Sequence, residues 1–564
     1  MSTTQGVLII NEFGNGFVNS SDKTIYIKKK DLNKAYHLEI VDIEYYEENG
    51  MYFGKVINYS LIGKSFVGLV YNFYKGDVFV LVPELKKNNL ISINTSIKLK
   101  KNDWVRVDIV SEDDNKLQGQ FVKLLPNILD DIIEEKFNLD QIDHEVKEFN
   151  NMNPNHIHVD QTDLDTFTID PFTSRDCDDA FSIKKINDIV HIYVHISDVA
   201  HYINPNNPLF EEIISRGNTY YGSEKNWTMI PRKYADDVCS ILPNKSTHVV
   251  TSEFMYDDMN NKLDYINTYY SIIKSKNKYW YDLVDQNFDI DKRFQIIYNS
   301  SQIIKKDMND LILVDETKSH EMVRYWMIHV NQIMCMEIKK LYRSNPVPQP
   351  ISSQFELIKK YQELHNQPIL SDSRENIVSF LKTNNNDNNK LCQFMVKCLL
   401  VKASYTTEDL SHYGIGISNY THWTSPIRRA SDLINHCLFK GYDINVTSYL
   451  ENINNCETTQ DKIEAFILNY NNYKNLKCED EQIYLAIILD IFPNSISVFI
   501  NKLNSKYTIH ISKLSKDKLI FDSMEKILKN ENENDNIEYK LFQEILLVID
   551  KVNFDSIEFS IKPN

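Results

Sequence analysis

The stretch TIDPFTSRDCDDAF, residues 168–181, carries the densest chemical signal in the chain. It gathers four carboxylates within ten residues, those of Asp170, Asp176, Asp178 and Asp179. Crowded carboxylates repel one another and raise each other's pKa unless a cation neutralises them. Mg²⁺ suits such a group because it binds carboxylates together with the oxygens of a substrate phosphate. Two such ions about 4 Å apart can activate water for phosphodiester hydrolysis, so the stretch predicts a catalytic metal site.

Two other interpretations of this stretch compete with a catalytic metal site. A calcium loop of the EF-hand type needs Asp or Asn at its third and fifth positions and Gly at its sixth. Those places hold Phe172, Ser174 and Arg175, so the pattern excludes that loop. A solvated acidic turn stays open on composition alone. The apolar residues interleaved with the carboxylates, such as Ile169 and Phe181, argue against it because they should bury the segment.

A second signal is HYGIGISNYTHWTSPIRRASDLINH, residues 412–436. Arg428 and Arg429 follow Pro426 in this stretch and precede a predicted helix. Adjacent arginines near the start of a helix suit phosphate recognition, because guanidinium groups pair with two phosphate oxygens and helix N-termini favour anions. Taken alone, the pair is better explained as salt-bridged surface arginines.

Together the two segments resemble the catalytic RNB domain of the ribonuclease II family. The metal motif of that family, TID, five residues and then D-x-D-D-A, matches residues 168–180 at every aspartate. YTHWTSPIRRASDL at 420–433 is similar to the second signature and departs from it at Ala430, where an aromatic residue is commoner. The blocks VHISDVAHYI at 194–203 and MIPRKYADDVCSILPN at 229–244 are similar to the intervening blocks of the family, in the same order.

The organisation around these motifs is multidomain. Short β-branched and aromatic runs with turn residues between them fill the first 130 residues and return after Ile483. The middle alternates strands, such as 188–199, with amphipathic helices, such as 321–338. The pattern and the resemblance together predict two N-terminal OB-type cold-shock β-barrels, a central α/β (α+β) RNB catalytic domain and a C-terminal OB-type β-barrel. The expected boundaries are 1–62 and 63–128 for the two cold-shock barrels, 129–160 for a linker, 161–445 for the RNB domain, 446–480 for a helical connector and 481–564 for the C-terminal barrel of the S-one type.

The resemblance implies an Mg²⁺-dependent, processive 3′→5′ exoribonuclease, with Mn²⁺ as the alternative ion. Its substrate would be single-stranded RNA and its products nucleoside 5′-monophosphates. The metal and catalytic carboxylates would be those of Asp170, Asp176, Asp178 and Asp179. Loss of Asp178 would most cleanly abolish cleavage, Arg428 would steady the scissile phosphate and Arg429 would support it. Tyr221 falls where the family places an aromatic that stacks on RNA near the 3′ end, although Tyr220 is adjacent.

Aromatic and basic residues of the first predicted barrel suit binding of single-stranded RNA. Phe17 and Tyr26 lie beside the lysines at 28–30, and OB-type barrels bind single strands by stacking bases on aromatic faces. The alternative is that these two rings pack inside the barrel, and the sequence leaves both interpretations open.

Composition neither supports nor excludes this function. The chain has 62 basic and 79 acidic residues, a net charge of −17, whereas nucleic-acid binders usually show a basic footprint. A basic channel can nevertheless lie within an acidic shell. The eight cysteines are scattered without a C-x-x-C pair, so neither a zinc ribbon nor a disulfide framework is predicted. Without a visible secretory signal or a stretch of about 20 apolar residues, we expect a soluble, cytoplasmic monomer that makes no membrane contact.

Two further motifs are rejected. GKS at 63–65 lacks the earlier glycine of a P-loop, where Asn58 stands, so no nucleotide cofactor is expected. His191 and His195 share one face of a predicted strand, with His201 beyond. No fourth ligand is evident, and zinc is not predicted there.

The main competing function is a catalytically silent RNA-binding protein on an RNB scaffold. The intact aspartates and the arginine pair argue against it, because a decayed enzyme tends to lose such groups. A nuclease acting on DNA is a more distant alternative.

Overall fold

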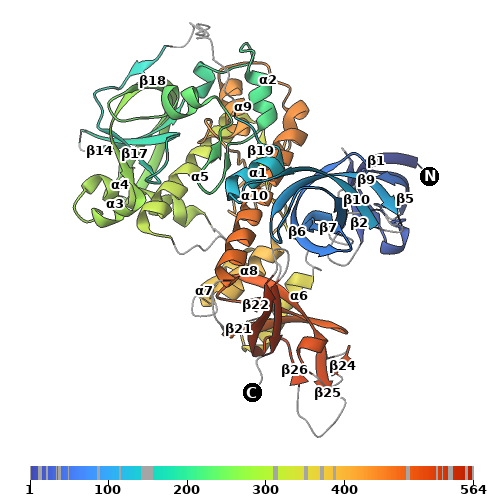
Figure 1. Ribbon diagram of the computed structural model, residues 1–564. Helices are drawn as coiled ribbons and strands as arrows, with labels where there is room; N and C mark the ends of the chain where they lie inside the picture. Colours follow the sequence, from blue (N-terminus) through green and yellow to red (C-terminus); the bar gives the residue numbers. More distant parts are fainter. Residues whose placement is uncertain are drawn as a thin grey trace. The chain divides into compact units, whose positions relative to one another are not determined.

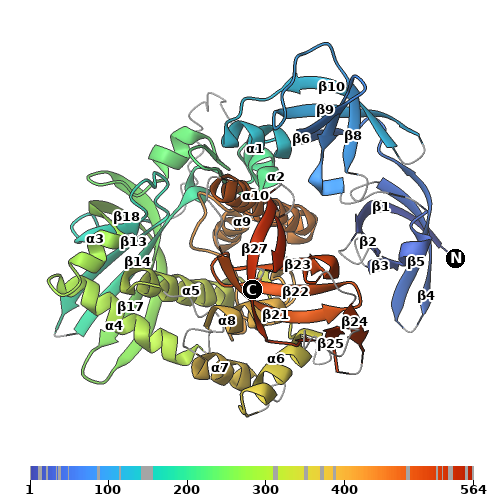
Figure 2. The ribbon, with the colours of Figure 1, turned by 60° about the horizontal axis from the view of Figure 1, so that its bottom comes forward.

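The computed structural model (Figures 1 and 2) divides the chain into two compact units, each considered by itself. One unit holds Met1–Asp140, Tyr221–Trp227 and Asp461–Tyr470, and the other holds the rest. The residues described are 2–10, 15–20, 23–33, 35, 40–48, 50–85, 89–113, 116–141, 157–187, 189–308, 316–348, 353–368, 374–384, 389–477, 483–515, 519–523, 525–530, 538–552 and 557–561.

The first unit begins with a closed barrel, in the strand order β1-β2-β3-β5-β4. Alternate residues point inward and bury an aliphatic core that includes Leu8 and Val41. A β-carbon at Gly54 would lie 2.7 Å from side-chain carbons of Ile25 and Ile43, so closing the barrel requires a glycine there. The strands are β1 (Ser2–Ile10), β2 (Gly16–Ser20), β3 (Lys23–Ile27), β4 (Ile40–Glu48) and β5 (Met51–Ser60).

A second closed barrel follows in the same unit, in the order β10-β8-β7-β6-β9. Its core consists of valines, leucines and isoleucines such as Val80, Val105 and Val107. Trp104 at the start of β9 packs edge-on against Phe466 of helix α10 (Leu450–Lys477), with ring centroids 5.7 Å apart. The elements are β6 (Ser65–Tyr74), β7 (Asp77–Leu81), β8 (Leu90–Asn94), β9 (Trp104–Asp113), β10 (Lys116–Leu124) and the helix α1 (Leu129–Phe137).

The centre of the second unit is a mixed sheet in the order β11-β18-β12-β13-β14-β17. The last strand, β17, also pairs with β18, so the sheet closes on itself. The long strand β18 bridges the closure, because it pairs with β12 on one edge and with β17 on the other. The strands are β11 (Val159–Asp160), β12 (Thr166–Asp170), β13 (Asp179–Ile186), β14 (Ile189–Ser197), β17 (Ser246–Asp257) and β18 (Lys262–Trp280).

Helices α3 (Tyr281–Gln286), α4 (Lys292–Asp307) and α5 (Lys318–Ile338) share one hydrophobic core with this sheet. Trp326 of α5 is fully buried and contacts Phe181 and Phe254, with ring centroids 6.4 and 4.9 Å apart. The predicted strand at 188–199 and the predicted helix at 321–338 are therefore confirmed as β14 and α5.

Other helices of the second unit form two further cores. α2 (Phe210–Arg216) and α9 (Ala430–Phe439) pack in one of them. In the other, α6 (Ser353–Leu364), α7 (Arg374–Thr383) and α8 (Asn389–Leu399) cover Phe499 of the C-terminal β-domain. Among the described helices, none is long and apolar enough to cross a membrane. The remaining short strands are β15 (Tyr220–Tyr221), β16 (Asn226–Trp227), β19 (Tyr342–Ser344) and β20 (Ser404–Thr406).

The C-terminal β-domain combines a sheet in the order β23-β22-β21-β27-β28 with a smaller sheet in the order β24-β25-β26. One buried core, which includes Tyr484 and Leu528, contains residues of both sheets. The expected multidomain fold, with two barrels, an α/β body and a C-terminal β-domain, is confirmed. The strands are β21 (Ile483–Phe492), β22 (Ser495–Ile500), β23 (Ser505–His510), β24 (Leu519–Asp522), β25 (Ile527–Asn530), β26 (Glu538–Tyr539), β27 (Glu544–Val552) and β28 (Ile557–Ile561).

Candidate active site

The four aspartates lie on one strand-to-strand connection of the second unit. β12 ends at Asp170, and β13 begins at Asp179 and runs back antiparallel to β12, with Phe167 opposite Phe181. The connection between them therefore returns to the edge of the sheet from which it left. That return brings the carboxylate at the end of one strand close to those at the start of the next.

Buried hydrogen bonds and apolar contacts hold this connection in place. Ser240 bonds to it twice, because its Oγ accepts from the Cys177 N–H at 3.0 Å and donates to the Arg175 carbonyl at 2.7 Å. The N–H of Ile241 donates to the Cys177 carbonyl at 3.0 Å. Cys177 and Ala180 are buried in a small apolar cluster with Ile241. A solvated turn would not be anchored in this way, so burial by the interleaved apolar residues is confirmed.

The carboxylates are poorly solvated and carry unpaired oxygens. Burial raises the pKa of Asp170, Asp178 and Asp179, and repulsion from Asp170 adds to the rise at Asp179. The Oδ2 atoms of these three residues are buried without a hydrogen-bond partner among the described residues. Buried charged groups without partners are costly. Three such oxygens on neighbouring carboxylates are the donor set that a divalent cation needs, so the site fits a metal.

The second sequence signal meets the aspartates here. The N–H of Ile427 donates to Asp178 Oδ1 at 2.8 Å, across 249 residues of sequence. The Nε of Arg428 lies 3.6 Å from Asp178 Oδ2, and its Nη2 donates to the Ser425 Oγ at 2.9 Å. The Arg428 side chain is 41% exposed, so its guanidinium faces both the carboxylates and solvent. A positive group at the rim of a carboxylate cluster can hold the phosphate of a nucleic acid.

These two segments decide the family. The family model for the RNB domain matches residues 158–443, which is half of the chain. The chain belongs to the RNB family.

Curated relatives agree with the assignment to the RNB family. Ribonuclease R of Aquifex aeolicus is 24% identical over 92% of this chain and 83% of its own length. Ribonuclease R of Chlamydia pneumoniae is 29% identical over 57% of this chain and 53% of its own length. Ribonuclease R of Mycoplasma genitalium is 31% identical over 50% of this chain and 44% of its own length. The resemblance to the RNB family that the motifs indicate is confirmed.

Solved structures share the fold of this RNB protein. Ribonuclease R of Mycoplasma genitalium, in complex with ribose-methylated single-stranded RNA, superposes with a TM-score of 0.82 at 21% identity, covering 99% of this chain and all of that one. Yeast Ssd1, described as a pseudonuclease, superposes with a TM-score of 0.70 at 17% identity, covering 93% of this chain and 81% of that one.

The adjacent arginines Arg428 and Arg429 bind different partners. Arg429 is buried and binds Asp432 through two hydrogen bonds, from Nε at 2.9 Å and from Nη2 at 2.8 Å. Asp432 also accepts from the Ser425 N–H at 2.8 Å. Arg428 therefore reaches the carboxylates, whereas Arg429 fixes the start of α9 to the loop that carries Arg428. The predicted catalytic role suits Arg428, and the contacts of Arg429 are those of a positioning residue.

Polar side chains from two buried helices hold the loop before these arginines. Asn331 of α5 accepts from the N–H groups of Trp423 and Thr424 at 2.7 and 3.2 Å. On α9, Asn435 donates to the Thr421 hydroxyl at 2.9 Å. Sequence reasoning missed Asn331 because nothing in the pattern of α5 (KSHEMVRYWMIHVNQIMCMEI) sets this asparagine apart from the other polar residues of the helix. Asp432 lay within the quoted motif and could have been singled out by its spacing of three from Arg429.

Aromatic residues that the sequence analysis did not single out flank the aspartates. Trp280 ends β18 opposite Asp170, and Tyr281 follows it and stacks on His320 with centroids 3.8 Å apart. Burial raises the pKa of Tyr281, and the charges of Asp179 and Asp170 add to that rise. Phe172 is 73% exposed and stands edge-on to Trp280. The run YWYDL at 279–283, where β18 ends and α3 begins, was the available signal.

The three predicted RNA-stacking aromatics belong to the first unit. Tyr221 lies on a short hairpin that Asp130 anchors, because this buried carboxylate accepts from the N–H groups of residues 223–225 at 2.6–2.8 Å. Phe17 and Tyr26 face each other on paired strands of the first barrel, with ring centroids 5.2 Å apart. Both rings are partly exposed, which favours the outer face over the interior. Contact with RNA stays a prediction for all three.

The different settings of the two arginines predict different consequences of substitution. In Arg429→Gln, the buried Asp432 loses its charged partner, which should lower the free energy of unfolding by about 3–5 kcal/mol. Arg428→Gln, the matched control, should change it by no more than about 0.5 kcal/mol because its side chain is half-exposed. Denaturant unfolding of both variants measures the difference. Equal losses would contradict the assigned roles.

Proposed function

We propose that this RNB exoribonuclease is an Mg²⁺-dependent, processive 3′→5′ enzyme that hydrolyses single-stranded RNA to nucleoside 5′-monophosphates. The observation that carries the proposal is that the buried Oδ2 atoms of Asp170, Asp178 and Asp179 have no hydrogen-bond partner among the described residues, while the Arg428 guanidinium lies 3.6 Å from that of Asp178. Mn²⁺ is the alternative ion, because oxygen ligands suit it as well. A cytoplasmic monomer that needs no nucleotide cofactor completes the proposal.

The residues of the site have two kinds of role in this reaction, holding the ions and positioning the groups around them. Asp170, Asp176, Asp178 and Asp179 would hold the ions. When bound, such ions supply Lewis acidity, which lowers the pKa of a water and offsets the charge that develops on the phosphate. The N–H of Ile427 keeps the Asp178 carboxylate in one orientation through Oδ1 and leaves Oδ2 turned toward the site.

Arg428 is the residue best placed to orient the phosphate. Its guanidinium carries a fixed positive charge and several donors, and Ser425 restrains it from one side. Attack of water on the phosphorus breaks the bond to the 3′ oxygen of the preceding nucleotide. The shortened RNA then ends in a 3′ hydroxyl, and the released nucleotide keeps the 5′ phosphate.

The first barrel offers a surface for single-stranded RNA. Phe17, Tyr26 and Phe53 form a row of rings with neighbouring centroids 5.2 and 6.0 Å apart. Lys28 Nζ lies 5.9 Å from the centre of the Phe53 ring. Rings interleaved with lysines bind bases by stacking and the backbone by charge, with little dependence on sequence. The RNA-bound relative from Mycoplasma genitalium supports single-stranded RNA as the ligand.

The alternative, a catalytically silent RNA-binding protein, is a real outcome for this fold, because yeast Ssd1 is described as a pseudonuclease. The complete set of aspartates and the position of Arg428 beside Asp178 favour the enzyme.

Replacing Asp178 by Asn should abolish RNA degradation and spare RNA binding. The amide keeps an oxygen that can accept from Ile427 but loses the charge that a metal needs. Degradation of 5′-labelled RNA with Mg²⁺ or EDTA measures the first effect and a filter-binding assay the second, with Asp307→Asn on the exposed end of α4 as control. Degradation by Asp178→Asn at the wild-type rate would refute the assignment.

Mg²⁺ should stabilise the folded protein, because it would neutralise buried carboxylates. At about 100 times its dissociation constant, a ligand of the folded state raises the free energy of unfolding by about 2.7 kcal/mol. Thermal unfolding with and without Mg²⁺ should show this gain in the wild type and lose most of it in Asp178→Asn. An equal gain in both proteins would place the ion elsewhere.

The ring pair on the first barrel should contribute to RNA affinity and not to chemistry. Phe17→Ala and Tyr26→Ala should each weaken binding of single-stranded RNA by about 1–3 kcal/mol and leave kcat unchanged at saturating RNA. Tyr74→Ala, an exposed ring of the second barrel, serves as the matched control. A fall in kcat without a change in KM would contradict a binding role.

A further inference from the structure

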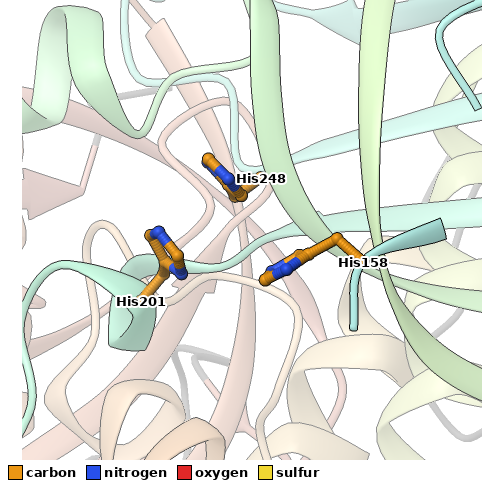
Figure 3. Close-up of side chains that lie close together, drawn as sticks. All are labelled: His158, His201 and His248. Atoms are coloured by element: carbon orange, nitrogen blue, oxygen red, sulfur yellow. The ribbon is translucent and has the colours of Figure 1, made fainter. Parts of the chain in front are cut away.

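Three histidines gather in the second unit, on segments that are far apart in the sequence (Figure 3). His158 directly precedes β11, His201 ends the short helix at Val199–His201, and His248 lies near the start of β17. One nitrogen from each ring lies within 4.8 Å of the others. The aspartates and Arg428 do not belong to this group.

The register of the sheet explains why they meet. β11 and β17 pair with the same part of β18, since Asp160 and His248 are both opposite Ile272. His158 and His248 are therefore brought to the two sides of one strand. The short helix after β14 places His201 beside them, and its ring stacks on His248 with centroids 4.1 Å apart. His158 stands edge-on to both rings, at 5.4 and 4.9 Å.

Burial disfavours the charged form of two of the rings. Burial, with a smaller contribution from the neighbouring His248, lowers the pKa of His201 to about 4. Burial also lowers the pKa of His248, and the charge of His158 adds to the effect. A lowered pKa favours the neutral imidazole, which is the form that binds metal ions. Lys440 is nearby, but Asp198 offsets its charge through an ion pair of 2.7 Å.

A hydrogen bond orients one of the rings. The Tyr202 hydroxyl lies 2.9 Å from His248 Nδ1, which leaves Nε2 of that ring for a metal. The Nε2 of His201 is buried without a hydrogen-bond partner among the described residues. A buried nitrogen without a partner lowers the stability of the fold, and a cation bound to it would remove that penalty.

We propose that His158, His201 and His248 form a zinc site that is separate from the aspartates. Three neutral imidazoles with an open fourth position are a common zinc ligand set. Nitrogen ligands about 2.0–2.1 Å from a tetrahedral ion lie about 3.3 Å from one another. The planes of the stacked His201 and His248 rings differ by only 14°, so one of these rings has to rotate before both lone pairs point at one ion.

The site would fasten the strand that leads into the RNB domain. β11 has two residues, both with exposed side chains, so packing holds it weakly. A metal bond from His158 to the helix at 199–201 and to β17 would tie this strand to the body. The fourth position would hold water.

His191 and His195, the other histidines of the predicted strand, do not join this site. His191 Nδ1 binds Glu253 at 2.8 Å, and both ring nitrogens of His195 are hydrogen-bonded, to Ser182 and Thr251. His201, in contrast, lies beside histidines that are distant in sequence.

Zinc binding to the full chain tests the proposal. The protein is freed of metal with a chelator and titrated with zinc chloride in excess Mg²⁺, which occupies the aspartates. The wild type should bind one equivalent of zinc and gain thermal stability. His158→Ala and His201→Ala should lower the zinc affinity more than about a hundredfold, because loss of a residue that only hydrogen-bonds to a ligand already costs about 10–100-fold. Tyr202→Phe should show that smaller loss.

Two controls separate this site from the aspartates. His191→Gln, on the same sheet, and Asp178→Asn should both keep the zinc equivalent, so the result stands whether or not the proposed nuclease function holds. Substitution with Co²⁺ should give a tetrahedral visible spectrum that His158→Ala lacks. His158 lies at an exposed strand, so this variant tests the site even if His201→Ala fails to fold. No zinc equivalent in excess Mg²⁺, or its loss in Asp178→Asn and not in His158→Ala, would overturn the proposal.

Discussion

The hydrogen bond from the Ile427 N–H to Asp178 holds the candidate site together. It joins two irregular segments that belong to opposite ends of the RNB domain, neither of which has regular structure of its own at that point. Asp178 is 4% exposed, so the bond gives a buried carboxylate one partner and fixes the direction of its other oxygen. Different side chains hold the two segments. Ser240 hydrogen-bonds to the segment that carries Asp178, and Asn331 and Asp432 hydrogen-bond to the segment that carries Ile427.

The sequence predicted the family well and the residues that support the candidate site poorly. The spacing of the aspartates and the arginine pair identified the family, and periodicity predicted elements such as β14 and α5. Nothing local distinguishes Arg428 from Arg429, because their difference depends on which one the turn into α9 directs toward Asp432. Asn331 and the histidine group were invisible for the same reason, since strand register and helix packing bring their partners from distant segments.

The carboxylates also show a conflict between stability and function. A core that was optimised for folding alone would not bury oxygens that have no partner, because each adds an unfavourable free energy. The surrounding sheet and its aromatic core offset that cost. Phe181, which comes directly after the aspartates, is fully buried, and so is Trp326, which packs against the Phe181 ring. An unfavourable contribution of this kind to the folding free energy is expected where a site is arranged in advance for a ligand.

The strand β18 sets the positions of both the histidine group and the aspartates along the sheet. It pairs with Val159 and Asp160 at its middle and with Asp170 at its end. Side chains alternate between the two faces of a strand, so a one-residue insertion or deletion between these pairings would turn one set of partners to the wrong face. A two-residue change would keep the faces and shift one group along the strand relative to the other. The length of this part of β18 should therefore be far less free to vary among relatives than its composition.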